Sequence, residues 1–211
     1  MAAKIEEYAM IGDCRTAALV SLTGSIDWLC LPRFDSMACF AGIVGTSGNG
    51  RWRIAPVNTR YTASRTYLDG SLILRTRFQT EDGAVELTDF MPVEQENSHI
   101  VRMITCSEGS VSLESELLVR FDYGLTPPWI RKTDDRTTTM ISGPDRLVLR
   151  SELATDITDE KVTATFDVHK GDKFIFILSH GPSHLPPPST IEPERLFQRT
   201  KAWWKGWSGR C

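Results

Sequence analysis

The sequence predicts a mostly β domain, an antiparallel β-sandwich followed by a C-terminal linker helix. Three observations lead to this fold class. Apolar and polar residues alternate with a period of two along several runs, which is typical of strands with one buried face. Glycine-containing turns separate these runs about every ten residues, as in sandwiches. Helical periodicity is almost absent before the last part of the chain. At 211 residues such a sandwich can fold as one unit.

The clearest alternating run covers residues 111–121. Its apolar side chains point one way and its serine, glutamate and arginine side chains point the other way, which predicts a half-buried strand. Residues 72–79 and 162–168 alternate in the same manner, whereas residues 173–178 are apolar on both faces and predict a strand that is covered on both sides. The apolar positions of the first run are Val111, Leu113, Leu117, Val119 and Phe121.

Turn residues lie between the predicted strands. Glycine accepts the positive φ angle of tight hairpin turns, and Asp or Asn before it favours the same geometry. Each such pair therefore predicts a reversal of the chain. The predicted turns are Thr23-Gly24, Asp69-Gly70, Asp82-Gly83, Glu108-Gly109 and Lys170-Gly171-Asp172.

The composition changes near residue 181, which divides the chain into a sandwich domain at 1–181 and a linker with a helix at 182–211. The segment 181–189 contains four prolines, which remove backbone donors and predict a semi-rigid spacer. A helix is predicted from about Glu192 to Ser208, with Pro193 in its first turn. One side of this helix is strongly apolar and is expected to be poorly covered by the sandwich: Leu196, Phe197, Trp203, Trp204 and Trp207.

The overall composition is that of an ordinary globular protein. The 24 basic and 27 acidic residues are interspersed, so no basic face for nucleic acid or a membrane surface is predicted. The start of the chain lacks the hydrophobic region of a signal peptide, and no apolar run is long enough to cross a bilayer. Five cysteines without a C-x-x-C pair predict free thiols and a cytoplasmic location. A zinc site built from Cys14, Cys30 and Cys39 fits no usual ligand spacing, and we predict neither a metal nor a cofactor.

No catalytic residue can be named from the sequence. With 27 acidic residues in the chain, many carboxylate pairs could serve as the acid and base of a glycosidase, so the sequence favours none of them. The glycine-rich residues 42–50 lack the Gly-Lys-Ser/Thr ending of a phosphate-binding loop. No nucleophile elbow or metal-ligand spacing of histidines occurs. Five aspartates lie among apolar residues, and we expect them to cap turns or to pair with arginines such as Arg15, Arg33 and Arg120. They are Asp13, Asp27, Asp35, Asp89 and Asp122.

Residues 8–45 contain the best candidate for a binding surface. Two short strands, 17–22 and 25–31, are joined by a Thr-Gly turn and followed by an exposed loop. Polar and aromatic residues that gather on a loop at a strand end are typical of binding rims. The alternative is that a buried Arg–Asp pair braces the loop. The candidate rim residues are Asp27, Trp28, Arg33, Phe34, Asp35 and Ser36.

This opening segment resembles the N-terminal domain of glucoamylase- and trehalase-like enzymes of glycoside hydrolase family 15. The similarity continues in the same order along nearly the whole chain. The segments that carry it are residues 8–45, 74–78, 87–92, 100–103, 119–124 and the tryptophan-rich segment 200–207.

The resemblance implies a many-stranded β super-sandwich joined by a linker to an (α/α) barrel. The family hydrolyses α-glucosidic bonds with inversion, and its two catalytic glutamates lie in the barrel, which this chain does not contain. We therefore expect a non-catalytic domain that packs against the barrel of the parent enzyme and lends its rim loop to the active site. The apolar side of the helix is expected to dock between the two domains or, without the barrel, to form a dimer.

Two other functions are compatible with the sequence. An autonomous carbohydrate-binding module would need exposed, coplanar aromatic side chains on which a sugar ring can stack. The candidates for that role are Trp28, Trp52 and Trp129. A free-standing regulatory or interaction protein is the second alternative, and the aromatic-rich end of the chain argues against it.

Overall fold

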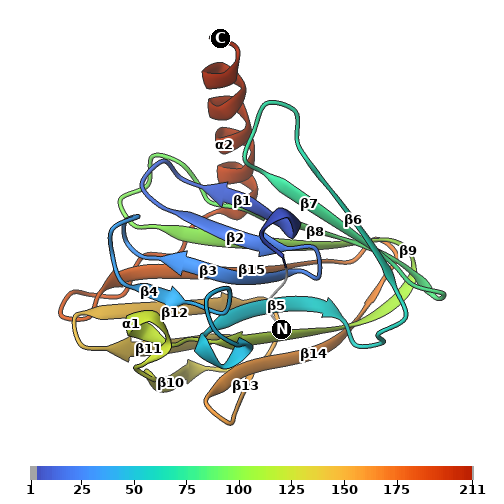
Figure 1. Ribbon diagram of the computed structural model, residues 1–211. Coiled ribbons are helices and arrows are strands. Elements are labelled where there is room, and N and C mark those ends of the chain that lie inside the picture. The colour runs from blue at the N-terminus through green and yellow to red at the C-terminus, as the bar shows by residue number, and fades with distance from the viewer. Residues whose placement is uncertain (1–3, 211) are drawn as a thin grey trace.

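A computed structural model describes residues 4–210 of the chain. Its strands pair in antiparallel fashion throughout, and one long helix, α2 (Pro193–Ser208), follows the last strand (Figure 1). The shorter helical elements are η1 (Ile5–Glu7), η2 (Ser47–Asn49) and α1 (Phe121–Gly124). The strands are β1 (Tyr8–Gly12), β2 (Ala17–Ser21), β3 (Ser25–Cys30), β4 (Ala38–Phe40), β5 (Arg51–Pro56), β6 (Thr62–Tyr67), β7 (Leu74–Gln79), β8 (Gly83–Phe90), β9 (His99–Leu118), β10 (Trp129–Asp134), β11 (Thr137–Ser142), β12 (Asp145–Ser151), β13 (Asp156–Thr158), β14 (Lys161–His169) and β15 (Lys173–Pro182).

The strands form two layers that share β9. One layer has the order β1-β2-β3-β5-β9-β14-β13, with β4 added beside β3. The other has the order β6-β7-β8-β9-β15-β12-β11-β10. The first half of β9 pairs in the second layer and its last half pairs in the first, so this strand ties the layers together. The predicted antiparallel sandwich with a C-terminal helix is confirmed.

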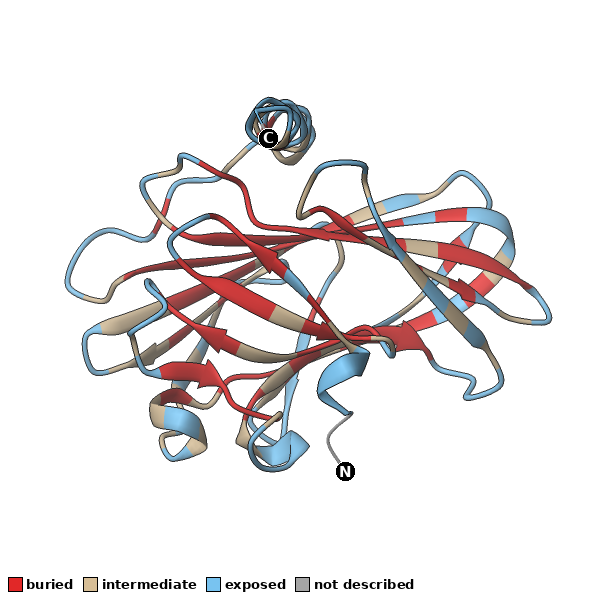
Figure 2. Cartoon of the chain, turned by 45° about the horizontal axis from the view of Figure 1, so that its top comes forward, coloured by how far each residue is buried: buried red, intermediate tan, exposed pale blue. Residues whose placement is uncertain are grey.

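The main core lies between the two layers (Figure 2). The alternation predicted for residues 111–121 is present as far as Leu118, because Val111, Leu113 and Leu117 are buried while Ser112 is exposed. The strand ends there, and Phe121 begins α1 instead. Burial of these apolar side chains is the dominant favourable contribution to folding. The largest side chains in the core include Trp52, Phe40, Phe78 and Phe176, all of them fully buried.

Two predicted turns are wrong. Glu108-Gly109 does not reverse the chain, because β9 runs through it as a single strand of 20 residues. The pairing with β8 shifts there, with Ala84 opposite Glu108 and Val85 opposite Cys106, so the glycine accompanies a β-bulge. Gly109 has φ of 63°, and a Cβ at this position would lie 1.9 Å from the Asp82 carbonyl oxygen. Lys170-Gly171-Asp172 does not reverse the chain either, because β14 and β15 both pair antiparallel with β9 and continue along it in the same direction. The three other predicted turns do connect consecutive antiparallel strands.

A buried ion pair connects the two layers near the middle of the core. Arg102 on β9 and Asp89 on β8 are both fully buried, with Arg102 Nε 2.8 Å and Nη2 3.2 Å from the two carboxylate oxygens. The same guanidinium donates to the carbonyl oxygens of Trp52 and Gly24 in the other layer, at 2.7 Å each, and lies 5.0 Å from the centre of the Trp52 ring. Asp89 was expected to pair with an arginine, and its partner is Arg102.

Helix α2 packs on the outer face of the second layer, which corrects the expectation that the sandwich covers it poorly. Six apolar residues form a second cluster on that face, and Phe197 and Ile191 pack against it. The rings of Phe197 and Phe90 meet edge to face at 5.6 Å. The cluster consists of Ile73, Phe90, Val101, Met103, Ile175 and Ile177. Figures 1 and 2 show the helix lying outside the sandwich with its C-terminal end pointing away.

The proline-rich segment before α2 runs along the same outer face. Arg146 on β12 donates to the carbonyl oxygens of Ser183 and Leu185, and Arg150 on the same strand donates to that of Pro188 at 2.6 Å. Because prolines prevent this segment from forming a regular hydrogen-bonded helix or central strand, its carbonyl groups are available to such side-chain donors. The segment is thus held against β12 by two arginines.

Candidate functional site

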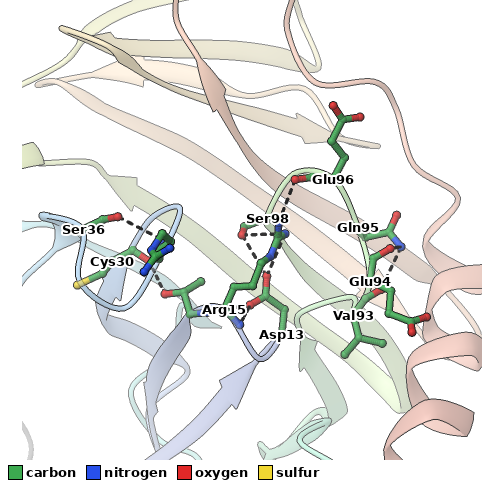
Figure 3. A network of polar contacts seen from close by, with 11 residues as sticks. Asp13, Arg15, Cys30, Ser36, Val93, Glu94, Gln95, Glu96 and Ser98 are labelled. Carbon is green, nitrogen blue, oxygen red and sulfur yellow. Dashed lines mark hydrogen bonds and ion pairs between the residues drawn. The ribbon is translucent and has the colours of Figure 1, made fainter.

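Three loops meet at the end of the sandwich that lies at the left of Figure 1. They are the turn 13–16 between β1 and β2, the loop 31–37 after β3 and the loop 91–98 between β8 and β9. Side-chain hydrogen bonds join the turn 13–16 to the loop 91–98 (Figure 3), and a backbone hydrogen bond joins the same turn to the loop 31–37. We call this region the loop end.

Asp13 is the centre of the polar network at the loop end. One carboxylate oxygen accepts from the backbone N–H groups of Arg15 and Thr16, both at 2.9 Å, and so closes the turn. The other oxygen accepts from the Ser98 hydroxyl at 3.0 Å. Asp13 is buried, and a buried carboxylate is stable only when its oxygens are paired in this way. The expected turn-capping role of Asp13 is confirmed.

Arg15 joins the three loops. Its guanidinium donates to the Glu96 carbonyl oxygen at 3.0 Å and to the Ser98 hydroxyl at 3.4 Å, while its own carbonyl oxygen accepts from the backbone N–H of Phe34 at 3.1 Å. Loop 31–37 is therefore attached to Arg15 through its backbone. Within this loop, the side chains of residues 32–35 are exposed, whereas Leu31 is buried.

The loop 31–37 presents an exposed ion pair. Arg33 Nε lies 2.8 Å from one Asp35 carboxylate oxygen, and both side chains are 71% exposed. The hydrogen bond from Arg33 lowers the pKa of Asp35 below its ordinary value. The alternative of a buried bracing pair is wrong, because bonds between Arg33 and Ser36 close the loop instead. Phe34 is exposed, and an open pocket of about 570 Å³ is lined by Cys14, Arg15, Pro32, Arg33, Phe34 and Asp35.

Asp27 and Trp28 lie away from this loop, within β3. The Asp27 carboxylate accepts from the Tyr8 hydroxyl at 2.7 Å and from the Ser25 hydroxyl at 2.5 Å. The Trp28 ring packs against Tyr123 with centroids 6.2 Å apart. The structure therefore brings Arg33, Phe34, Asp35 and Ser36 together, and it does not bring Asp27 and Trp28 into the same pocket.

The five apolar residues predicted on α2 have different environments. Leu196 and Trp204 are buried, and Phe197 packs on the sandwich. Trp203 and Trp207 lie against Trp204, with ring centroids 4.9 and 5.8 Å away, and Trp207 is 53% exposed. The helical side that faces the sandwich also includes Thr200, which is buried one turn from both Leu196 and Trp204.

Glu94 connects α2 to the loop end, and sequence reasoning missed it. Its carboxylate accepts from Arg199 Nη2 at 2.8 Å and from Trp203 Nε1 at 3.2 Å. The bond from Arg199 lowers the pKa of Glu94. A second ion pair, between Glu194 on α2 and Lys173 on β15 at 2.9 Å, fixes the start of the helix. An exposed glutamate in a loop carries no sequence signal, because its partners are more than 100 residues away.

The carboxyl groups with shifted pKa values are ion-pair groups. Hydrogen bonds from Arg33, Arg199 and Lys173 lower the pKa of Asp35, Glu94 and Glu194 respectively. Burial alone would raise the pKa of Glu116, but bonds from Lys161 and Arg51 outweigh it and lower the pKa. A general acid of a glycosidase needs the opposite shift.

The cysteines predicted to be free thiols lie in different environments. Cys14 is exposed, and Cys30, Cys39 and Cys106 are buried, which raises the pKa of each of these three thiols. Within residues 4–210, no three His, Cys, Asp or Glu side chains are grouped so that they could hold a metal ion. None of the helices in this range is long and apolar enough to span a membrane.

Comparison with known proteins identifies the family. Residues 1–204 match the family described as "Trehalase-like, N-terminal". The chain is a trehalase-like N-terminal domain. It is 29% identical to the trehalase of Mycolicibacterium smegmatis over 94% of its own length and 34% of that protein, and 28% identical to the trehalase of Mycobacterium tuberculosis over 94% and 33%. Trehalase 1 of Sulfolobus acidocaldarius is 30% identical over 95% of this chain and 34% of that protein.

The trehalase-like N-terminal domain spans about a third of the length of these curated relatives. Two of the segments that carried the family resemblance have a structural role. Asp89 lies in the segment 87–92 and Arg102 in the segment 100–103, and together they form the buried ion pair between the layers. The segment 119–124 contains α1, in which Asp122 and Tyr123 both have positive φ angles.

Only one of the three tryptophans considered for carbohydrate binding is well exposed. Trp52 is fully buried beneath Arg102, so it offers no surface for a sugar. Trp28 is half-buried against Tyr123. Trp129, at the start of the edge strand β10, is 68% exposed.

Proposed function

We propose that this chain is the non-catalytic N-terminal domain of an inverting α-glucoside hydrolase of glycoside hydrolase family 15, with trehalose as its substrate. The observation that carries the proposal is the match of almost the whole chain to one third of several trehalases. A catalytic (α/α) barrel in the same polypeptide is the proposed intramolecular partner. Free cysteines among the described residues support a cytoplasmic enzyme.

The loop end and the exposed side of α2 form the proposed contact surface for this catalytic domain. Loop 31–37 is held through its backbone, so Arg33, Phe34 and Asp35 can reach a neighbouring domain without disturbing the sandwich. Glu94 in loop 91–98 binds Arg199 and Trp203 of α2, and this contact supports a surface that includes both the loop end and the helix. In this proposal, residues 182–211 are the linker between the two domains. Dimerisation through the helix stays a prediction.

The proposal is tested by attaching this chain to a known catalytic part. The chain alone should release no glucose from trehalose, maltose or soluble starch, because the paired acid and base of an inverting enzyme lie elsewhere. When it replaces the matched N-terminal third of the Mycolicibacterium smegmatis trehalase, the hybrid should hydrolyse trehalose. The proposal would be contradicted if the chain alone released glucose and a single carboxylate substitution abolished this release. It would also be contradicted if the catalytic part were fully active without any N-terminal domain.

In this hybrid, Asp35→Ala is expected to lower the rate of trehalose hydrolysis without changing stability. Within residues 4–210 the Asp35 carboxylate bonds to no side chain except Arg33, and both groups are exposed to water, so the ion pair contributes little to folding. Trehalose hydrolysis and the urea midpoint of the same samples measure the two effects. Glu108→Ala is the matched control, because Glu108 on β9 is the exposed ion-pair partner of Arg77 on β7. A loss of stability with Asp35→Ala would show that the loop is structural.

A further inference from the structure

A groove on the outer face of the second layer lies between the edge strand β10 and the proline-rich segment. Its volume is about 330 Å³, at the lower end of the range of about 300–1,000 Å³ that is usual for small-molecule sites. The register of the strands places Trp129 opposite Ile141 and Arg131 opposite Thr139, all on this face. The lining residues are Trp129, Arg131, Thr133, Thr139, Ile141, Arg146 and Pro187.

The apolar part of the groove is suited to a flat, partly apolar ring. Trp129 is 68% exposed, so its indole contributes little to the core of the domain and its ring remains available for stacking. Ile141 and Pro187 complete the apolar lining. Pro187 is held there because Arg146 and Arg150 bind the carbonyl oxygens of neighbouring residues in the same segment.

The polar part of the groove is rich in donors and positively charged. Among the described residues that line it, two are arginines, two are threonines and none is acidic. Arginine presents a planar array of N–H donors that matches carboxylate and phosphate groups. A ligand that brings its own negative charge therefore complements this lining better than a neutral one.

Three acidic side chains that lie close in sequence to the groove residues have other partners. Asp134 accepts from the backbone N–H of Arg136 at 2.8 Å, and Asp135 pairs with Lys132 at 3.6 Å. Asp145, which precedes Arg146, lies 2.9 Å from His180 Nε2. These contacts leave the charge of Arg131 available to a ligand.

We infer that this groove binds an anionic sugar, a pyranose with one carboxylate or phosphate group. The sugar ring stacks on Trp129 and its anionic group accepts hydrogen bonds from Arg131. None of the described residues that line this groove belongs to the loop end or to α2. Binding of the anionic sugar in this groove is independent of the hydrolysis of a glycosidic bond.

Calorimetric titration of the full chain with four probes tests the inference. Glucose 6-phosphate and glucuronate should bind more tightly than glucose, which lacks the charge, and the phosphate sugar more tightly than inorganic phosphate, which lacks the ring. Raising the salt concentration should weaken both anionic sugars. Binding of only one anionic sugar would support the inference and identify the group that Arg131 recognises.

Variants locate the site. Trp129→Ala and Arg131→Gln should each weaken binding about tenfold or more, because exposed Trp and Arg side chains that contact a ligand dominate binding energies. Trp207→Ala, a change of another exposed tryptophan, should leave binding unchanged, and circular dichroism confirms that all variants are folded. The inference is overturned if no probe binds at millimolar concentration, if glucose binds as tightly as the charged sugars, or if Trp129→Ala has no effect.

Discussion

Asp89→Ala is expected to lower the free energy of unfolding by about 3–5 kcal/mol, because it leaves the charge of Arg102 buried without a partner. For a domain of this size, that loss corresponds to a fall in Tm of about 6–20 °C. Because the free energy of unfolding of native domains is only about 5–15 kcal/mol, this substitution removes a large part of it. Urea denaturation followed by circular dichroism measures the change.

Asp35→Ala in the isolated chain is the matched control for this prediction. It also removes a carboxylate that binds an arginine through two oxygens, but this pair is exposed, so stability should not change measurably. The double variant Asp89→Leu/Arg102→Met removes both buried charges and should recover part of the loss. Recovery should be incomplete, because the carbonyl oxygens of Trp52 and Gly24 then lose their donor. Equal effects of Asp89→Ala and Asp35→Ala would contradict this account of the core.

Trp204→Ala is expected to cost about 3–5 kcal/mol of the free energy that holds α2 against the sandwich. The Trp204 side chain is buried, and the helix end lies so close to the β6–β7 turn that a Cβ on Gly70 would be 2.6 Å from the Ser208 hydroxyl. The apolar cluster under α2 is separate from the main core, so the helix should detach while the sandwich stays folded. Faster amide exchange confined to residues 193–208 would measure this.

Two controls distinguish packing from other effects of the substitution. Trp204 Nε1 is buried without an acceptor, so Trp204→Phe removes an unsatisfied donor together with some volume and should cost less than about 1.5 kcal/mol. Trp207→Ala should change exchange little, since that ring is half exposed. If Trp204→Ala left helix exchange unchanged, the helix would be held by Leu196, Phe197 and the ion pairs of Glu94 and Lys173, and not by Trp204.

The packing of α2 also changes what a truncation should do. From the sequence, deletion of residues 190–211 is expected to leave a folded and more monomeric sandwich. In the structure, this deletion would uncover Phe90, Val101, Met103 and their neighbours on the outer face. Exposed apolar patches promote association. The truncated domain should therefore stay folded but associate more strongly, as sedimentation can measure.

Local patterns were sufficient for most strands and turns. Alternation identified the strands around residues 74–78, 111–118 and 162–168, since side chains of neighbouring residues in a strand face opposite sides of a sheet. Glu108-Gly109 failed because a glycine with positive φ serves a bulge as well as a turn, and only the partner strand distinguishes them. Whether the chain reverses there depends on how residues 83–85 of β8 pair with β9, which the residues around Glu108-Gly109 do not reveal by themselves.

The candidate site was predicted only in part. Residues 33–36 are adjacent in the chain and therefore share one loop, whereas Asp27 and Trp28 were included because of their proximity in sequence and lie elsewhere. Arg15, Ser98 and Glu94 complete the loop end through contacts between distant segments. Such contacts leave no periodic pattern in a single sequence.

The sequence by itself determined the fold class, the final helix and the family resemblance, because period, turn residues and ordered motifs are all local properties of the chain. Tertiary structure alone decided which charges are paired and which aromatic rings are exposed. Asp89 and Asp35 are both aspartates near arginines, yet one is buried in the core and the other lies in water. In the same way, Trp52 and Trp204 are buried whereas Trp129 is exposed. The physical reason is that burial depends on which distant segments cover a side chain, and that is set by the packing of whole layers.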